Sequence, residues 1–192
     1  MTVAVPTGFR LVEMPGFAVA VPEPWQAVPI NTEEIGKLIE SARTSNPPLA
    51  ESLETFRAQA GDDGKLLVID MSGPGASFSV IRAANARRLT PAELGKARDD
   101  LLDPNVTGGI DTQLQRAGAQ DVLREKVDLP AGASIRTTYR LPLATASGAR
   151  DVYGLQYYTP AAEAVFILSY ATPDLAAYRV TFDQIAWTFS IR

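Results

Sequence analysis

Histidine and cysteine are both absent from this chain of 192 residues. Without histidine there is no imidazole general base, no Ser-His-Asp triad and no histidine metal ligand. Without cysteine there is no disulfide, no zinc ribbon, no thiol nucleophile and no cysteine to carry a lipid. Many enzyme classes are thereby excluded, and we expect a protein that is not an enzyme and that holds no cofactor and no metal.

Long hydrophobic runs are also missing. The longest strongly apolar run, Ala164–Leu168, is far shorter than the roughly 20 residues that span a bilayer. Residues 1–30 show no basic segment followed by an unbroken apolar stretch, which is the pattern of a secretory signal. We therefore predict no transmembrane segment and a cytoplasmic location, although a trimmed secreted chain would look the same.

The chain has no excess of basic charge. Lys and Arg number 18 against 22 Asp and Glu, which gives a net charge of −4 with both signs mixed along the chain. The densest basic group, Arg82, Arg87 and Arg88, has no aromatic residues interleaved. It is typical of a solvated strand end rather than of a phosphate site, so we predict no nucleic-acid partner.

The residues that are present have the composition of a globular protein. Hydrophobic residues make up 46% and charged residues 21% of the chain, both of which are ordinary values. No repeat, low-complexity stretch or long linker divides the sequence. We expect a single domain over residues 1–192.

Strand patterns begin near the start of the chain. Phe9–Glu13 and Phe17–Val21 have the pattern of two short strands around a turn. Lys65–Met71 is almost entirely apolar, which predicts a strand covered on both faces, and Phe78–Ala84 completes a hairpin with it. From Gln120 to Ala171 polar and apolar residues alternate between short turns, which predicts an antiparallel meander.

Helix signals separate and follow these strands. Thr90-Pro91-Ala92-Glu93 combines a capping residue, a proline at the first position and the glutamate of a capping box. Further helices are predicted from Asn31 and from Asn46, the second ending at Gly61. The closing helix follows Thr172-Pro173-Asp174, and it carries the longest apolar stripe of the chain: Leu175, Tyr178, Phe182, Ile185 and Phe189.

Helices before, between and after antiparallel strands define the α+β class. Because Lys65–Met71 is apolar on both sides, helices are expected on both faces of the sheet. The predicted architecture is a three-layer α/β/α sandwich around a mainly antiparallel sheet.

Three short motifs carry a resemblance to a known family. The segment from Gly16-Phe17 to Pro22-Glu23-Pro24-Trp25 resembles an opening strand followed by Pro and Trp, and Ala84-Asn85 resembles a recurrent pair at the end of a hairpin strand. Phe182, Ile185 and Phe189 are similar to the closing helix. With the order of elements over nearly the whole chain, these motifs resemble the PsbP-like superfamily. It includes the oxygen-evolving PsbP proteins, the Ran-binding Mog proteins, the LpqN-type mycobacterial lipoproteins, and the DcrB-like and Eag-type proteins.

The resemblance implies a non-catalytic binding or adaptor module, which assists an assembly, escorts a client or binds a partner protein. Fourteen Arg against four Lys, with abundant Ala, is typical of high-GC genomes and favours the LpqN-like, actinobacterial-like side of the family. LpqN-type proteins carry a lipidated cysteine that this chain lacks, so membrane anchoring is not implied. The family's Ran-binding acidic residues and metal sites have no matching positions here.

Aromatic residues are the candidates for a partner or ligand surface, because Tyr is amphipathic and enriched at interfaces. Five tyrosines lie in the predicted meander, and Trp25 follows Pro22 and Pro24. The alternatives are cross-strand packing for the tyrosines and a core plug at one end of the sheet for Trp25. The candidate surface residues are Trp25, Tyr139, Tyr153, Tyr157, Tyr158 and Tyr170.

Three polar segments have a structural interpretation beside a chemical one. Asp62-Asp63 is either a carboxylate pair or a turn, and Asp99, Asp100 and Asp103 form either a calcium site or a solvated helix end. Ser72–Ser77 is a glycine-rich loop without the Lys of a phosphate cradle. We predict the structural interpretation for each, and hence no catalytic, cofactor-binding or metal-binding residue.

The sequence favours a non-catalytic protein-binding or adaptor/chaperone module of the PsbP-like or LpqN-like type, with a protein partner. The alternative is a small-molecule or lipid carrier, with a cavity under the C-terminal helix. An enzyme that uses only carboxylates would need two of them converging in a cleft, and the acidic candidates lie on separate turns.

Overall fold

The computed structural model describes residues 4–30, 33–45, 54, 64–70, 75–103, 114, 116–145 and 148–192. Within these ranges lie three helices: α1 (Glu33–Ser45), α3 (Pro91–Asp100) and α5 (Leu175–Thr188). The same ranges hold ten strands: β1 (Phe9–Met14), β2 (Phe17–Pro22), β3 (Gln26–Pro29), β4 (Gly64–Asp70), β5 (Ala76–Ala84), β6 (Gln120–Leu129), β7 (Gly132–Thr145), β8 (Gly148–Pro160), β9 (Ala164–Thr172) and β10 (Ser190–Ile191).

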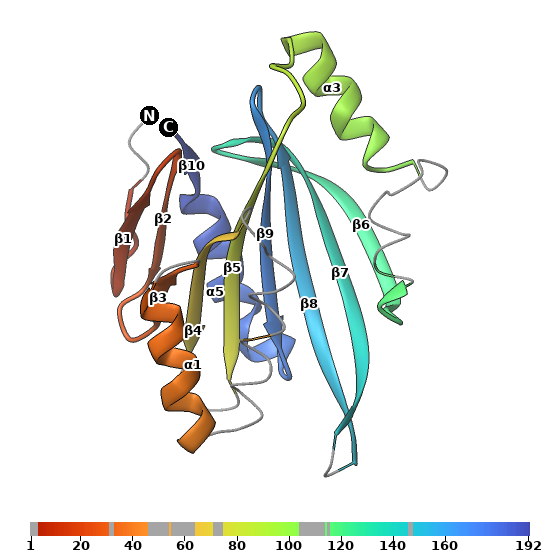
Figure 1. Cartoon of the computed structure of the whole chain (residues 1–192). Coiled ribbons are helices and arrows are strands. Elements are labelled where there is room, and N and C mark those ends of the chain that lie inside the picture. The colour runs from red at the N-terminus through yellow and green to blue at the C-terminus, as the bar shows by residue number, and fades with distance from the viewer. Residues whose placement is uncertain are drawn as a thin grey trace.

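The strands form two antiparallel sheets (Figure 1). The larger sheet has the order β3-β4-β5-β9-β8-β7-β6, and the smaller one has the order β1-β2-β10. Every pair of neighbouring strands in both sheets is antiparallel. Strands β6 to β9 pair in chain order through short connections, which confirms the predicted meander. Crossovers bring β9 beside β5 and β10 beside β2.

Helices cover both faces of the larger sheet. On one face, α1 packs on β3 and β4, and α3 contacts β7 and β8. On the other face, α5 packs on β8 and β9 and also contacts β2 of the smaller sheet. The α+β class and the antiparallel sheet between helical layers are confirmed. The third layer also contains a three-stranded sheet that the sequence did not predict as a separate unit.

Strand β4 shows why the larger sheet needs cover on both sides. Leu66 and Val68 belong to the cluster under α5, whereas Leu67 and Ile69 pack with α1. Since successive side chains of a strand point to opposite faces, an uninterrupted apolar run requires two buried faces. The prediction made from Lys65–Met71 is confirmed.

The aromatic stripe of α5 lies at the centre of the main core. Phe182 is fully buried, and its ring centroid lies 4.6 Å from that of Tyr170 and 6.3 Å from that of Trp25. Phe189 packs on Phe17 of β2 and on a phenylalanine of β9. Complete burial of each such side chain contributes about 1.5–3 kcal/mol before entropy, so this helix joins the two sheets.

Local signals set the first residues of α3 and α5. Thr90 and Glu93 form the predicted capping box of α3, with Pro91 in its first turn. Asp174 caps α5 by accepting a hydrogen bond from Ala177 N at 3.1 Å. These caps satisfy N–H groups that a helix leaves open at its first turn, and they are readable from sequence.

The structure gives a role to the Ala84-Asn85 pair. Asn85 Nδ2 donates to the carbonyl oxygens of Ala161 and Ala162 at 3.0 and 3.2 Å, and Asn85 N donates to Glu163 O at 2.9 Å. Asn85 therefore holds the turn between β8 and β9 against the end of β5. This is a structural role.

Some expectations differ from the structure or fall outside its described part. The short strand β3 was not predicted. Apart from Glu54, the helix predicted from Asn46 to Gly61 lies outside the described residues, as do the Asp62-Asp63 turn and residues 72–74 of the loop Ser72–Ser77.

Candidate functional site

The face of α5 that points away from the sheet carries two large apolar side chains. Val180 is 69% exposed and Trp187 is 56% exposed. They are seven residues apart, so they lie on one side of the helix, two turns from each other. Tryptophan side chains are on average largely buried, whereas Trp187 exposes more than half of its surface to solvent.

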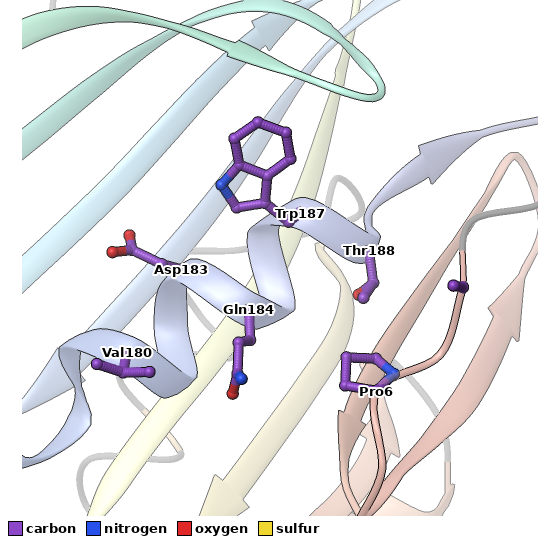
Figure 2. Close-up of a pocket in the computed structure, with 7 residues that line it drawn as sticks. Pro6, Val180, Asp183, Gln184, Trp187 and Thr188 are labelled. Atoms are coloured by element: carbon purple, nitrogen blue, oxygen red, sulfur yellow. The ribbon is translucent and has the colours of Figure 1, made fainter.

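A hollow of about 310 Å³ lies beside these two residues. Figure 2 shows it between α5 and the segment that precedes β1, with Pro6 facing the end of the helix near Thr188. We name the lining of this hollow the α5 surface: Ala4, Pro6, Val180, Asp183, Gln184, Trp187 and Thr188. Its volume is at the lower end of the range for ligand sites, and it opens to solvent.

Asp183 connects the α5 surface to the larger sheet. Tyr157 Oη donates to Asp183 Oδ1 at 2.6 Å, and Arg136 Nη1 donates to the same oxygen at 3.2 Å. Arg136 Nε also donates to Glu125 Oε1 at 2.8 Å. The carboxylate of Asp183 therefore already has a phenol and a guanidinium as partners.

This arrangement disfavours acid–base chemistry. Burial, followed by the hydrogen bond to Asp183, raises the pKa of the Tyr157 phenol well above its usual range. A protonated phenol that donates to a paired carboxylate is neither a nucleophile nor a base at neutral pH. The lining of the α5 surface combines apolar side chains with the amide of Gln184.

The structure buries most of the residues that the sequence put forward as a surface. Trp25 packs against Tyr178 and Phe182, at centroid distances of 6.0 and 6.3 Å. Tyr157 and Tyr170 lie in the same core, with their rings edge to face at 6.0 Å. These contacts match the packing alternative given for Trp25 and for the tyrosines.

The six aromatic candidates are also distributed over two faces. Tyr153, Tyr157 and Tyr170 lie on the α5 face, because their cross-strand partners include Thr172, Leu168 and Leu155. Tyr139 and Tyr158 lie on the opposite face, where they pack with residues that follow α3. Tyr158 Oη donates to Gln156 Oε1 at 2.7 Å. A role of these residues in contacting a partner stays a prediction.

Trp187 and Val180 were missed by the sequence reasoning. The stripe Leu175, Tyr178, Phe182, Ile185 and Phe189 accounts for the buried side of α5. Val180 and Trp187 are large apolar residues that fall off this stripe. An apolar residue off the stripe of an otherwise amphipathic helix is the signal that could have found them.

Rings in contact fill the space between α5 and the sheet, as far as the described residues show. Tyr178 stacks on Phe182 at 5.8 Å, and Phe78 stacks on Tyr170 at 4.8 Å. The described hollow lies on the other side of the helix. The carrier alternative, with a cavity under this helix, stays a prediction.

Four of the charged candidates, Arg87, Arg88, Asp99 and Asp100, are engaged in ion pairs. Lys126 Nζ lies 3.0 Å from Asp99 Oδ1, and Lys96 Nζ lies 2.7 Å from Asp100 Oδ2. Arg87 pairs with Glu93, and Arg88 lies 3.5 Å from Glu163. Within the described ranges, no group of three acidic side chains is arranged to hold a metal ion. None of the helices in those ranges is long and apolar enough to cross a bilayer.

Comparison with known proteins identifies the fold. No family model and no curated protein matches the sequence. Among solved structures, the chain is similar to cyanobacterial PsbP (CyanoP) from Synechocystis sp. PCC 6803, with 13% identity over 97% of this chain and 94% of that one and a TM-score of 0.56. A protein of unknown function from Pseudomonas aeruginosa, PA94, matches with 13% identity over 94% of both chains and a TM-score of 0.43.

The likeness to CyanoP extends over nearly the full length of both chains. At this identity it concerns the fold, and the finer resemblance to the LpqN, Mog, DcrB and Eag types stays a prediction. The chain has a PsbP-like fold.

Proposed function

We propose that this chain is a non-catalytic protein-binding module, an adaptor or chaperone, and that the α5 surface holds an apolar side chain of its partner protein. The exposed ring of Trp187 carries the proposal. Tryptophan is among the residues most enriched in the energetic centres of protein interfaces, where it packs against an apolar anchor of the partner.

The neighbourhood of Trp187 supports this use. Val180 extends the apolar area along the helix, and Ala4 and Pro6 add apolar atoms from the segment before β1. The Asp183 carboxylate is paired with Arg136, which it shares with Glu125, so this cluster of three side chains keeps a net charge of −1 beside the apolar area. The helix is fixed from below by its aromatic stripe, so the surface is rigid before binding, which lowers the entropy cost of association.

The absence of catalysis is part of the proposal. The sequence supplies no histidine and no cysteine, and Tyr157 and Asp183 hold each other in an unreactive pair. The finer assignments, namely a single domain over residues 1–192, a cytoplasmic location and the LpqN-like type, stay predictions.

The test is site-directed crosslinking followed by affinity measurement. A photo-reactive phenylalanine replaces Trp187 in one variant and the exposed Leu123 of β6 in another, and each is irradiated in native lysate. The partner that crosslinks through position 187 and not through position 123 is purified, and its dissociation constant for the unmodified chain is measured by calorimetry.

The affinity step decides the proposal. Trp187→Ala is expected to weaken binding by about 30-fold or more, as for a central interface residue. Leu123→Ala is the matched control, because Leu123 is 71% exposed and lies outside the α5 surface. Equal affinities of the two variants would show that the α5 surface does not hold the partner.

A further inference from the structure

The sheet edges of this fold are protected to different degrees. An uncovered edge strand offers unpaired N–H and C=O groups to other chains, and proteins guard such edges with short strands, bulges, prolines and charges. At one edge of the larger sheet, β3 is four residues long and ends at Pro29. At its other edge, β6 has a register shift between Gln120 and Leu123, with Asp121 at a φ of 54°.

Of these devices, the edge at β1 has only the charged side chains of Arg10 and Glu13. Strand β1 pairs with β2 without interruption, through six consecutive residue pairs from Phe9 to Met14. It contains no proline and no lysine. Figure 1 shows β1 at the outer side of the smaller sheet, and within the described part of the chain no strand pairs with it on that side.

The hydrogen-bond pattern shows which groups face outward. Glu23 N donates to Gly8 O at 2.9 Å, so this pair is one of the bonded pairs of the ladder. Bonded and non-bonded pairs alternate along antiparallel strands, so Leu11 and Glu13 direct their N–H and C=O groups away from β2. Ala20, which lies opposite Leu11, confirms this phase, because its N–H bonds to Thr188 Oγ1 on the far edge of β2.

The side chains of β1 set the chemistry of a strand that could pair there. Leu11 is 44% exposed, on the same face as Glu13, and Arg10 and Val12 lie on the other face. Glu13 Oε1 accepts a hydrogen bond from Arg192 Nη2 at 2.6 Å, and Arg10 Nη2 donates to Trp25 O at 2.8 Å, so an incoming strand would share these charged groups with partners in the same chain. Opposite charges and apolar pairs directly across a ladder stabilise it, whereas like charges oppose it. A complementary antiparallel segment therefore has, from its N-terminal end, a basic residue opposite Glu13 and apolar residues opposite Val12 and Leu11. Its fourth residue, opposite Arg10, is acidic.

We propose that the open edge of β1 takes an extended segment of a partner protein as an additional antiparallel strand, with the pattern basic-apolar-apolar-acidic. Main-chain bonds from Leu11 and Glu13 supply the affinity, and the alternating side chains supply the selectivity. The edge of β1 is separate from the α5 surface, so this proposal does not depend on the function proposed above.

The test uses two synthetic peptides and amide-resolved NMR. The matched peptide is acetyl-Thr-Lys-Val-Ile-Glu-Thr-amide, and the control exchanges its Lys and Glu. The matched peptide is expected to bind the full chain at least about fivefold more tightly than the control, because two charge pairs become two repulsions. It is also expected to slow hydrogen exchange at the Leu11 and Glu13 amides while leaving that at Val12 unchanged.

Leu11→Pro removes an outward N–H and leaves the bonds between β1 and β2 in place, so this variant is expected to lose peptide binding. Leu11→Thr keeps the N–H and is expected to retain most of it. Equal binding of both peptides, or protection of amides elsewhere than on β1, would overturn the proposal. Protection of Leu11 that rises with chain concentration in the absence of peptide would assign the edge to a second copy and overturn it as well.

Discussion

The ring of Tyr139 lies directly over Gly154 on the neighbouring strand. The two residues are paired across β7 and β8, and a β-carbon on Gly154 would stand 2.1 Å from Tyr139 Cζ. Burial raises the pKa of the Tyr139 phenol to about 12. A ring at this position fills the space that glycine leaves in a sheet, and it does so beside the cluster that packs under α3.

Gly154→Ala is therefore expected to destabilise the protein by about 1–3 kcal/mol, as overpacking does in a filled core. Urea unfolding measures the change. In the double variant Tyr139→Ala/Gly154→Ala, the added methyl group has room. The double variant should therefore lose less unfolding free energy than the sum of the losses in the two single variants. Strict additivity would show that the ring and the glycine do not constrain each other.

Tyr170→Phe is expected to leave stability unchanged or to raise it by about 1 kcal/mol. Tyr170 Oη is buried and has no hydrogen-bond partner among the described residues, and a buried hydroxyl without a partner is unfavourable. Tyr157→Phe is the matched comparison, because it removes the bond to Asp183 and should cost about 1–3 kcal/mol. Thermal unfolding of both variants decides this, and a large loss in Tyr170→Phe would contradict the assignment.

Thr188 joins α5 to the smaller sheet. Its Oγ1 accepts a hydrogen bond from Ala20 N at 2.8 Å and donates to Ile185 O at 2.8 Å. Thr188→Val keeps the shape and leaves a buried N–H without its acceptor, so we expect a loss of about 1–3 kcal/mol in unfolding free energy. Thr188→Ser keeps the hydroxyl and should lose less than half as much. If both variants lost equally, packing rather than the hydrogen bond would hold the helix end.

Glu93 gives α3 a pH dependence that can be measured. The hydrogen bond from Arg87, followed by those from the backbone and hydroxyl of Thr90, lowers the pKa of its carboxyl from 4.5 to about 2. The folded state then binds fewer protons than the unfolded chain in this range. The contribution of Glu93 to stability is thus present above pH 4.5 and is lost as the pH falls towards 2.

The measurement is the difference in unfolding free energy between the unmodified chain and Glu93→Gln. It should be constant above about pH 5.5 and shrink between pH 4.5 and pH 2. A difference that does not change over that interval would mean that the carboxylate gains nothing from Arg87 and Thr90.

Local patterns were sufficient for most elements. The capping box at Thr90, the alternation from Gln120 onward and the apolar run at Lys65–Met71 each depend on neighbours in the chain, so they are visible in it. Strand β3 was not predicted, because a segment of four residues is too short to show an alternation of polar and apolar side chains. Two adjacent tyrosines, Tyr157 and Tyr158, must point to opposite faces of a strand. Both were nevertheless grouped in one candidate surface, because the prediction from sequence considered only how many aromatic residues the segment contains.

The sequence by itself determined the class of fold, the antiparallel meander and the exclusion of histidine and cysteine chemistry, because these follow from residue types and from periods of two and 3.6 residues. Tertiary structure alone decided that β1, β2 and β10 form a separate sheet, that Trp187 stays exposed while Trp25 is buried, and that no strand of the described residues pairs with the outer side of β1. Those outcomes depend on which distant segments come together. Whether a tryptophan such as Trp25 or Trp187 is buried depends on which layers pack against it, and its own residue type does not decide this.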